Sequence, residues 1–213
     1  MKLTNLLAVA AAAAFLSAGS ASAAVQTLDL TGAQVSGVGT AFGSFDNGTG
    51  LSGTIDLTPS VCGPFCTTTL TQTSDGLGFN RGADLTEGLD SAFFISESLT
   101  FNFATTVIFD SVSFTALGAF GGAFDDWDIS VNGATVASAS KDNPYIFNGE
   151  TGESLTISAI YTGADFANGG EFFFFDNFRV KSIDATVVPL PAAGWLLLAG
   201  VGGLAALKRR KKA

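Results

Sequence analysis

The densest acidic cluster of the sequence is Asp125-Asp126-Trp127-Asp128, in which three carboxylates fall within four residues. Calcium prefers six to eight oxygen ligands, and a loop of closely spaced carboxylates and carbonyls can supply them. The spacing differs from that of an EF-hand loop, and no Glu follows at the position that such a loop requires. Asp125, Asp126 and Asp128 are therefore a candidate calcium site. A solvated loop that enters a strand is the alternative interpretation.

A second set of acidic residues, Asp90, Glu97 and Asp176, lies just before or inside predicted strands. A carboxylate inside an apolar strand, as at Asp176, is costly to bury unless it is hydrogen-bonded. It could coordinate calcium, pair with Arg179 or Arg81, or accept hydrogen bonds from backbone amides. For this set we favour the structural roles over a metal site.

Exposed aromatic side chains are the other groups that could bind a ligand, because aromatic rings can stack on sugar rings. Trp127 heads a predicted strand, and Tyr145 lies in the turn-rich segment Asp142-Asn143-Pro144-Tyr145. We take Trp127 and Tyr145 as candidate glycan contacts and expect Tyr145 to be the more exposed. Core packing is the alternative, and we expect it for most of the twenty Phe residues, since large aromatic side chains dominate the cores of β-sandwich domains.

The sequence contains no histidine, which excludes Ser-His-Asp and Cys-His nucleophilic sites and zinc sites with histidine ligands. A glycoside hydrolase is the enzymatic alternative, because it needs only two carboxylates about 5–9 Å apart across a cleft. Nineteen acidic residues make some such pair almost inevitable, so their number does not identify a hydrolase. We predict that the chain is not an enzyme.

The two cysteines, Cys62 and Cys66, stand in the segment Cys-Gly-Pro-Phe-Cys. In an oxidising compartment, two cysteines this close together are expected to form a local disulfide. A redox dithiol usually has two intervening residues, and two thiolates alone make a poor metal site. We therefore predict a structural disulfide between Cys62 and Cys66 that closes a turn.

Residues 1–23 have the pattern of a secretory signal peptide. Lys2 gives a positive start, residues 6–16 form an unbroken apolar run, and Ala21-Ser22-Ala23 fits the small-x-small site of signal peptidase. This pattern predicts cleavage after Ala23. An N-terminal membrane anchor is the alternative, but the apolar run is short for a membrane span.

The C-terminal segment has three parts in a fixed order. An apolar, Gly-rich stretch at 193–207 separates a proline motif from a basic cluster. A helix over 192–207 would be roughly 24 Å long, so snorkelling basic side chains and local thinning would complete its span of a core of about 30 Å. The basic cluster is expected to stay in the cytoplasm, with the preceding domain outside. The motif is Val188, Pro189, Leu190, Pro191 and Ala192, and the cluster is Lys208, Arg209, Arg210, Lys211 and Lys212.

This tail, residues 188–212, resembles the PEP-CTERM sorting signal in its VPLPA-CTERM variant, with Val-Pro-Leu-Pro-Ala in place of the usual Pro-Glu-Pro motif. The resemblance implies recognition by an exosortase-type transpeptidase, cleavage near Pro191, and release of the protein from the inner membrane to the cell surface or extracellular matrix. It also implies a Gram-negative bacterium that secretes an exopolysaccharide. A permanent single-pass anchor is the alternative.

Residues 24–187 are enough for one domain with a sizeable core. They hold all nineteen acidic residues of the chain and four basic ones, which gives a formal net charge of about −15. Such a domain repels nucleic acid and anionic lipid, so we expect no nucleic-acid partner. The charge is consistent with solubility outside the cell and with cation binding. The four basic residues are Arg81, Lys141, Arg179 and Lys181.

Apolar residues alternate with polar ones in short runs, and few stretches have a helical period. This pattern predicts an all-β fold, a single antiparallel β-sandwich of jelly-roll type, between the signal peptide and a C-terminal transmembrane helix. Asn132-Gly133 predicts a type I′ hairpin. We expect short strands among loops at 32–54 and an exposed loop at 76–89. The other expected strands are 25–30, 55–57, 98–103, a separate strand through Val112 and Phe114, 127–131, 134–137, 155–161 and 171–180.

Short motifs inside this domain resemble the domains usually carried by PEP-CTERM proteins. They are Gly76-Leu77-Gly78-Phe79, Gly88-Leu89-Asp90 and Glu97-Ser98-Leu99-Thr100-Phe101, in that order. Residues 175–180, Phe-Asp-Asn-Phe-Arg-Val, are also similar to the last strand of many carbohydrate-binding jelly rolls. The resemblance implies a jelly-roll-like fold and points to a glycan as ligand.

The sequence therefore predicts an exported surface or matrix protein with a structural or adhesive role in an exopolysaccharide or biofilm. A carbohydrate-binding, lectin-like module with calcium dependence is the second interpretation, and a glycoside hydrolase is the third. The partners implied are signal peptidase, an exosortase-type transpeptidase, a secreted polysaccharide and, transiently through the tail, the inner membrane.

Overall fold

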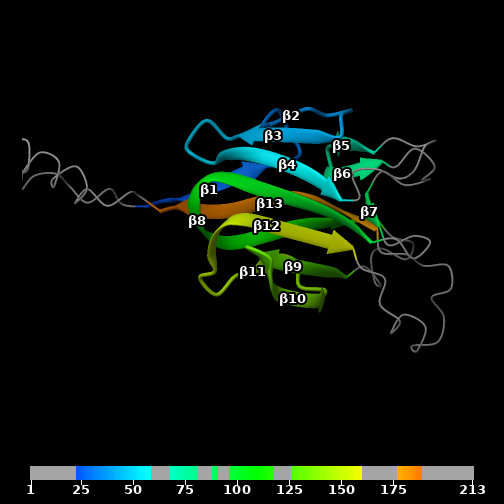
Figure 1. The fold of residues 1–213 in the computed structure, drawn as a ribbon. Coiled ribbons are helices and arrows are strands. Elements are labelled where there is room, and N and C mark those ends of the chain that lie inside the picture. The colour runs from blue at the N-terminus through cyan, green and yellow to red at the C-terminus, as the bar shows by residue number, and fades with distance from the viewer. Residues whose placement is uncertain are drawn as a thin grey trace, which may run out of the picture. The chain divides into compact units, whose positions relative to one another are not determined.

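The computed structural model describes residues 23–58, 68–80, 88–90, 96–117, 126–159 and 177–188 of the chain, with Phe79 and Asp90 described by backbone only. The regular elements in these residues are thirteen β-strands in one curled antiparallel sheet, with no helix among them (Figure 1). This confirms the predicted all-β class. The predicted signal peptide, the Cys62–Cys66 disulfide and the C-terminal helix lie outside the described residues. The residues Ala24–Val188 form a compact unit of their own.

Several predicted strands appear where the alternation of apolar residues placed them. Val25 begins the first strand, Trp127–Val131 forms another, and residues 98–103 and 155–159 are extended. In chain order the strands are β1 (Val25–Asp29), β2 (Val35–Ser36), β3 (Phe42–Asp46), β4 (Ser52–Thr58), β5 (Thr69–Thr73), β6 (Gly76–Asn80), β7 (Leu89–Asp90), β8 (Glu97–Ala116), β9 (Trp127–Val131), β10 (Ala134–Ser140), β11 (Tyr145–Ile146), β12 (Thr151–Ala159) and β13 (Asn177–Val187).

Strand β8 lies at the centre of the sheet and changes partners along its length (Figure 1). Its first half pairs with β4 on one side and β12 on the other. Its second half pairs with β13 on one side and with the start of β12 and then β11 on the other. The outer edge of β13 pairs in turn with β1, β6 and β7. One strand therefore joins both parts of the sheet.

The two halves of β8 are brought together by a bend between Phe103 and Phe109. Six residues of straight strand would span about 20 Å. The ring centroids of Phe103 and Phe109 are only 5.4 Å apart, in an edge-to-face contact. Ala104 and Thr105 are exposed at the bend. The strand therefore curls so that two of its own side chains meet in the core.

The prediction of two separate strands in this region was wrong, because β8 is continuous over twenty residues. Its buried side chains fall on odd-numbered positions as far as Phe109 and on even-numbered positions from Val112. The pairing with β13 shifts register between Asp184 and Ala185, opposite Asp110. A β-bulge at Asp110 therefore changes which side chains face inward without ending the strand.

The last described strand also runs further than predicted. β13 continues to Val187, seven residues past the predicted end at Val180, and residues 171–176 lie outside the described part of the chain. A register shift between Val180 and Ser182 leaves Lys181 exposed, and burial then resumes at Ile183. At this bulge the buried side chains change from even-numbered to odd-numbered positions. A rule based on regular alternation therefore did not predict the second half of the strand.

The prediction of an exposed loop at 76–89 was wrong where residues are described. β5 and β6 form an antiparallel hairpin, and Leu77 and Leu89 are fully buried. A Cβ atom at Gly76 would lie 2.4 Å from the carbonyl oxygen of Val180. The glycine at this position permits the close approach of β6 to β13.

The predicted Asn132-Gly133 hairpin joins β9 and β10. Asn132 has a φ of 49° and Gly133 a φ of 78°, as a type I′ turn requires. The Asn132 Oδ1 atom also accepts hydrogen bonds from the backbone nitrogens of Glu153 and Ser154, both at 3.1 Å. These bonds stabilise a register shift in β12 between Gly152 and Ser154.

Substitution of Gly53 tests how closely β4 and β8 are packed. A Cβ atom at Gly53 would lie 1.9 Å from the carbonyl oxygen of Asn102 and 2.7 Å from the ring of Phe45. We expect Gly53→Ala to lower the free energy of unfolding by about 3 kcal/mol, measured by urea denaturation, because backbone must move to admit the methyl group.

Gly48→Ala is the matched control, because Gly48 has a φ of 72° but nothing lies within 4 Å of the place that the added methyl group would take. Left-handed strain alone should cost about 1 kcal/mol there. Equal losses in the two variants would contradict the packing described for Gly53.

Candidate functional site

The acidic cluster before β9 is only partly described. Asp126 is buried, whereas Asp128 is half-buried on the outward side of β9, and Asp125 lies outside the described residues. The Asp128 Oδ1 atom accepts a hydrogen bond of 2.7 Å from the backbone nitrogen of Ala139. Among the described side chains, no group of three His, Cys, Asp or Glu residues could hold a metal ion. Calcium binding by this cluster stays a prediction, and Asp128 has a structural contact to β10.

Trp127 is a core residue in the structure. Its side chain is 3% exposed, and its ring stacks on Phe114 with centroids 4.1 Å apart and contacts Phe178 edge-on at 5.5 Å. Trp127, Ile129 and Val131 share the inward side of β9. A ring covered in this way offers no open surface to a sugar, so Trp127 has the packing role that was the alternative.

Tyr145 is half-buried on β11. Its hydroxyl donates to the carbonyl oxygen of Val136 at 3.2 Å, and its ring contacts Phe147 edge-on at 5.1 Å. Burial raises the pKa of the Tyr145 phenol, and the negative charges of Glu150 and Asp142 raise it further. Tyr145 is therefore less exposed than expected. Its hydroxyl and its ring make contacts that stabilise the fold.

The polar residues near the start of β8 and β13 are buried. Glu97 is fully buried, and Arg179 is 3% exposed. The Arg179 guanidinium donates to Thr71 Oγ1 and to the carbonyl oxygen of Gly76, both at 3.3 Å. Arg179 thereby ties β13 to the β5–β6 hairpin. Asp176 lies outside the described residues, and Asp90 is described by backbone only, in β7.

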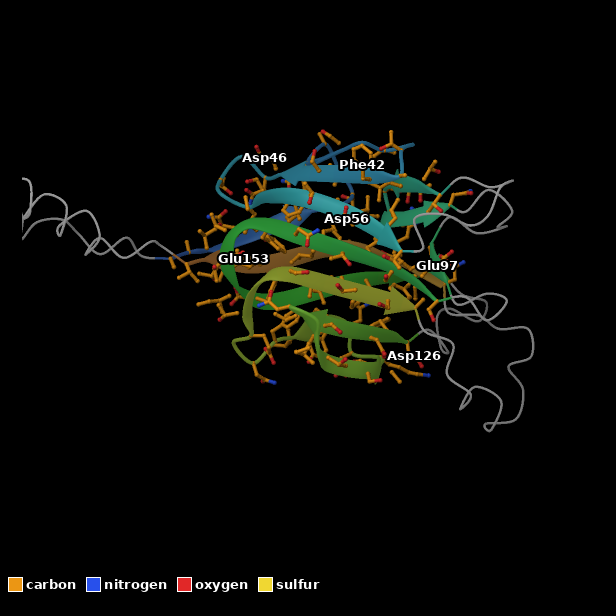
Figure 2. All side chains as sticks on the ribbon, in the orientation of Figure 1. Phe42, Asp46, Asp56, Glu97, Asp126 and Glu153 are labelled. Atoms are coloured by element: carbon orange, nitrogen blue, oxygen red, sulfur yellow. The ribbon has the colours of Figure 1, made fainter. Side chains whose placement is uncertain are left out.

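Short polar side chains cover the outward side of β3, β4, β8, β12 and β9, which we call the polar face. Figure 2 shows Asp56 on β4, with Phe42 and Asp46 near β3. The inward side chains of the same strands are buried in the core. The residues of the polar face are Ser44, Asp46, Thr54, Asp56, Thr58, Ser98, Thr100, Asn102, Ser154, Thr156, Ser158, Asp128 and Ser130, and all are exposed or half-buried.

Strand register aligns these side chains in rows across the sheet. The central row runs from Asp56 through Thr100 and Thr156 to Ser130, on four neighbouring strands. Within it, the hydroxyls of Thr100 and Thr156 are 3.0 Å apart. Asn102 Nδ2 donates to Asp56 Oδ2 at 2.7 Å, which links this row to the next.

Phe42 stands at the end of this central row. It is paired with Asp56 across β3 and β4, and its side chain is 69% exposed, more than any other large apolar side chain that the structure describes. The charged residues of the polar face are Asp46, Asp56 and Asp128, and no described Lys or Arg belongs to it. The polar face therefore combines one open aromatic ring with hydroxyl, carboxamide and carboxylate groups.

Polar residues beside β13 have a different role. Asp184 accepts hydrogen bonds from Thr27 Oγ1 at 2.6 Å and from Ser111 Oγ at 2.7 Å, and so joins β1, β13 and β8. Thr186 Oγ1 donates to Asp110 Oδ2 at 2.9 Å, at the bulge of β8. These groups bond to one another across strands, so they hold the sheet together.

The polar face was not predicted from the sequence. Its signal was present, because Ser, Thr and Asn fill every second position of 98–102 and 154–158. Only the strand register brings these positions together with β4 and β9. Phe42 was also missed, since it fell in a stretch expected to be mostly loops.

Comparisons with known proteins found no relative. No protein-family model matches the chain, and neither a curated protein nor a solved structure is significantly similar to it. In the described part of the chain, no helix is long and apolar enough to cross a membrane.

Titration of Tyr145 tests the environment of β11. The chain has two tyrosines, so the variant Tyr161→Phe leaves Tyr145 as the only phenol in an ultraviolet pH titration. We expect its pKa to lie above 10 and to fall toward 10 when Glu150→Gln removes a negative charge. Because the folded state favours the protonated phenol, this group's stabilisation should be present below pH 10 and lost as the pH rises through the folded pKa. A pKa at or below 10 would contradict the half-buried position.

Proposed function

We propose that this chain is an exported protein, sorted by an exosortase-type transpeptidase to the cell surface or extracellular matrix, with a structural or adhesive role among secreted polysaccharides. The observation that carries the proposal is the order of signals in the sequence. An apolar run with a small-x-small site precedes the acidic domain, and the Val-Pro-Leu-Pro-Ala motif, an apolar stretch and a basic cluster follow it.

The finer fold that we propose for the domain is a β-sandwich of jelly-roll type. The curled antiparallel sheet supports it, because β8 joins the part of the sheet containing β4 and β12 to the part containing β13 and β1. The core lies between these parts, where Phe45, Phe103 and Phe109 make successive edge contacts. We propose no catalytic role for the domain.

A carbohydrate-binding module is the second candidate function. The observation that favours it is the polar face, on which the exposed Phe42 stands beside Asp56. Calcium dependence through Asp125, Asp126 and Asp128 belongs to this candidate as a proposal. Binding to a polysaccharide would also supply the physical basis of an adhesive role.

The sorting proposal is tested by substituting the two prolines of the motif together, Pro189→Ala and Pro191→Ala, in the producing bacterium. Cell fractionation should find the wild-type protein at the surface or in the medium, and mass spectrometry should find its C-terminus near Pro191. The double variant should stay in the inner-membrane fraction at its full C-terminal length.

Asp75→Asn, in the β5–β6 turn, is a control that changes the domain and leaves the tail intact. It should be sorted like the wild type. A wild-type protein that keeps residues 192–212 at its final location would overturn the processing step and favour a permanent anchor.

A further inference from the structure

We propose that the polar face binds an uncharged, extended polysaccharide, with Phe42 stacking on a sugar ring and Asp56 and Asn102 hydrogen-bonding to its hydroxyl groups. The inference rests on the glycan-binding candidate of the proposed function, taken without its calcium dependence, and gives it a site and a ligand class. It uses residues of β3, β4, β8 and β12.

The first support is the kind of side chain on the face. The solvent side of an antiparallel sheet carries polar residues, and on this face they are the short side chains of Ser, Thr, Asn and Asp. Such short side chains lose little rotamer freedom when a ligand orders them. The strands hold them at a spacing of about 4.8 Å across the sheet and about 6.7 Å along it. A repeating polymer of hydroxyl groups can meet such an array at several points.

The second support is the position of Phe42. An aromatic ring that is 69% exposed has an uncompensated apolar surface, and it is placed beside the Asp56 carboxylate by the β3–β4 register. A sugar ring has an apolar face of C–H groups and an equatorial rim of hydroxyls. Phe42 can cover the former while Asp56 accepts hydrogen bonds from the latter.

The third support is the fixed geometry of Asp56 and Asn102. Asn102 Nδ2 donates to Asp56 Oδ2 at 2.7 Å, which orients both side chains before a ligand arrives. The other Asp56 oxygen and the Asn102 carbonyl can accept, and the second amide hydrogen of Asn102 can donate. A hydroxyl group needs both a donor and an acceptor, and this pair offers them side by side.

The charge of the face excludes anionic occupants. The ionisable groups on the face are carboxylates, so a polyuronate or a nucleic acid would be repelled. A second copy of the same face would bring Asp46, Asp56 and Asp128 against like charges. An uncharged glycan avoids both repulsions, and its hydroxyl groups can donate hydrogen bonds to the carboxylates.

The experiment measures binding of residues 24–188 to three polymers by isothermal titration and co-sedimentation, each with calcium and with chelator. The domain is used alone because Ala24–Val188 is a compact unit with its own core. The polymers are a neutral β-glucan, a polyuronate and a glucosamine polymer with free amines. We expect saturable binding to the β-glucan that is insensitive to chelator and to salt.

Variants locate the site. Phe42→Ala should weaken β-glucan binding about tenfold, and Phe42→Tyr should restore it. Ile146→Ala is the matched control, since Ile146 is 61% exposed on β11, outside the polar face, and it should leave affinity unchanged. Thr156→Lys should abolish binding, because it places a long side chain in the central row. Ser74→Lys, in the β5–β6 turn, is its control and should leave binding unchanged. Denaturation midpoints verify that each variant is folded.

Four results would overturn the proposal. They are no binding to the neutral polymer, binding only to the amine polymer that salt abolishes, self-association that Phe42→Ala removes, and chelator-sensitive binding that Phe42→Ala leaves unchanged. The last would direct attention to the Asp125–Asp128 segment. None of these results touches the sorting proposal, because the tested domain lacks residues 189–213, and sorting is judged in the bacterium.

Discussion

The contact between Phe103 and Phe109 is the interaction on which the rest of the structure depends. Both rings belong to β8, and they can meet only because the strand bends at Ala104 and Thr105. Without that bend, the half of β8 that pairs with β4 and β12 would continue straight past the half that pairs with β13. The core exists because one strand supplies the inward side chains of both parts of the curled sheet.

The sequence predicted the strands in which alternation is uninterrupted, such as Trp127–Val131, and the turn that Asn132-Gly133 forms. It failed at Asp110 and Lys181, where bulges reverse the phase of burial within a single strand. It also failed at Gly76, where the glycine serves close packing against Val180. A bulge and a close approach both depend on how a strand pairs with its neighbour. The local sequence of one strand does not show this pairing.

The candidate site shows the same division. The acidic cluster around Asp128 and the aromatic residue Trp127 were visible as composition, but composition could not say that Trp127 points inward against Phe114. The polar face was missed for the opposite reason. The residue types on this face are common in any strand. They form a continuous polar surface only because the strand register aligns Asp56 with Thr100 and Thr156.

The irregularity of β10 has a consequence for assembly. This strand ends one path through the sheet, its pairing with β9 shifts register twice, and Ala139 has a φ of 47° where the Asp128 carboxylate holds its backbone nitrogen. A straight terminal strand would offer an aligned row of unpaired amides and carbonyls to another chain. The kinked strand does not present that row, so its geometry disfavours the addition of a strand from another chain at β10.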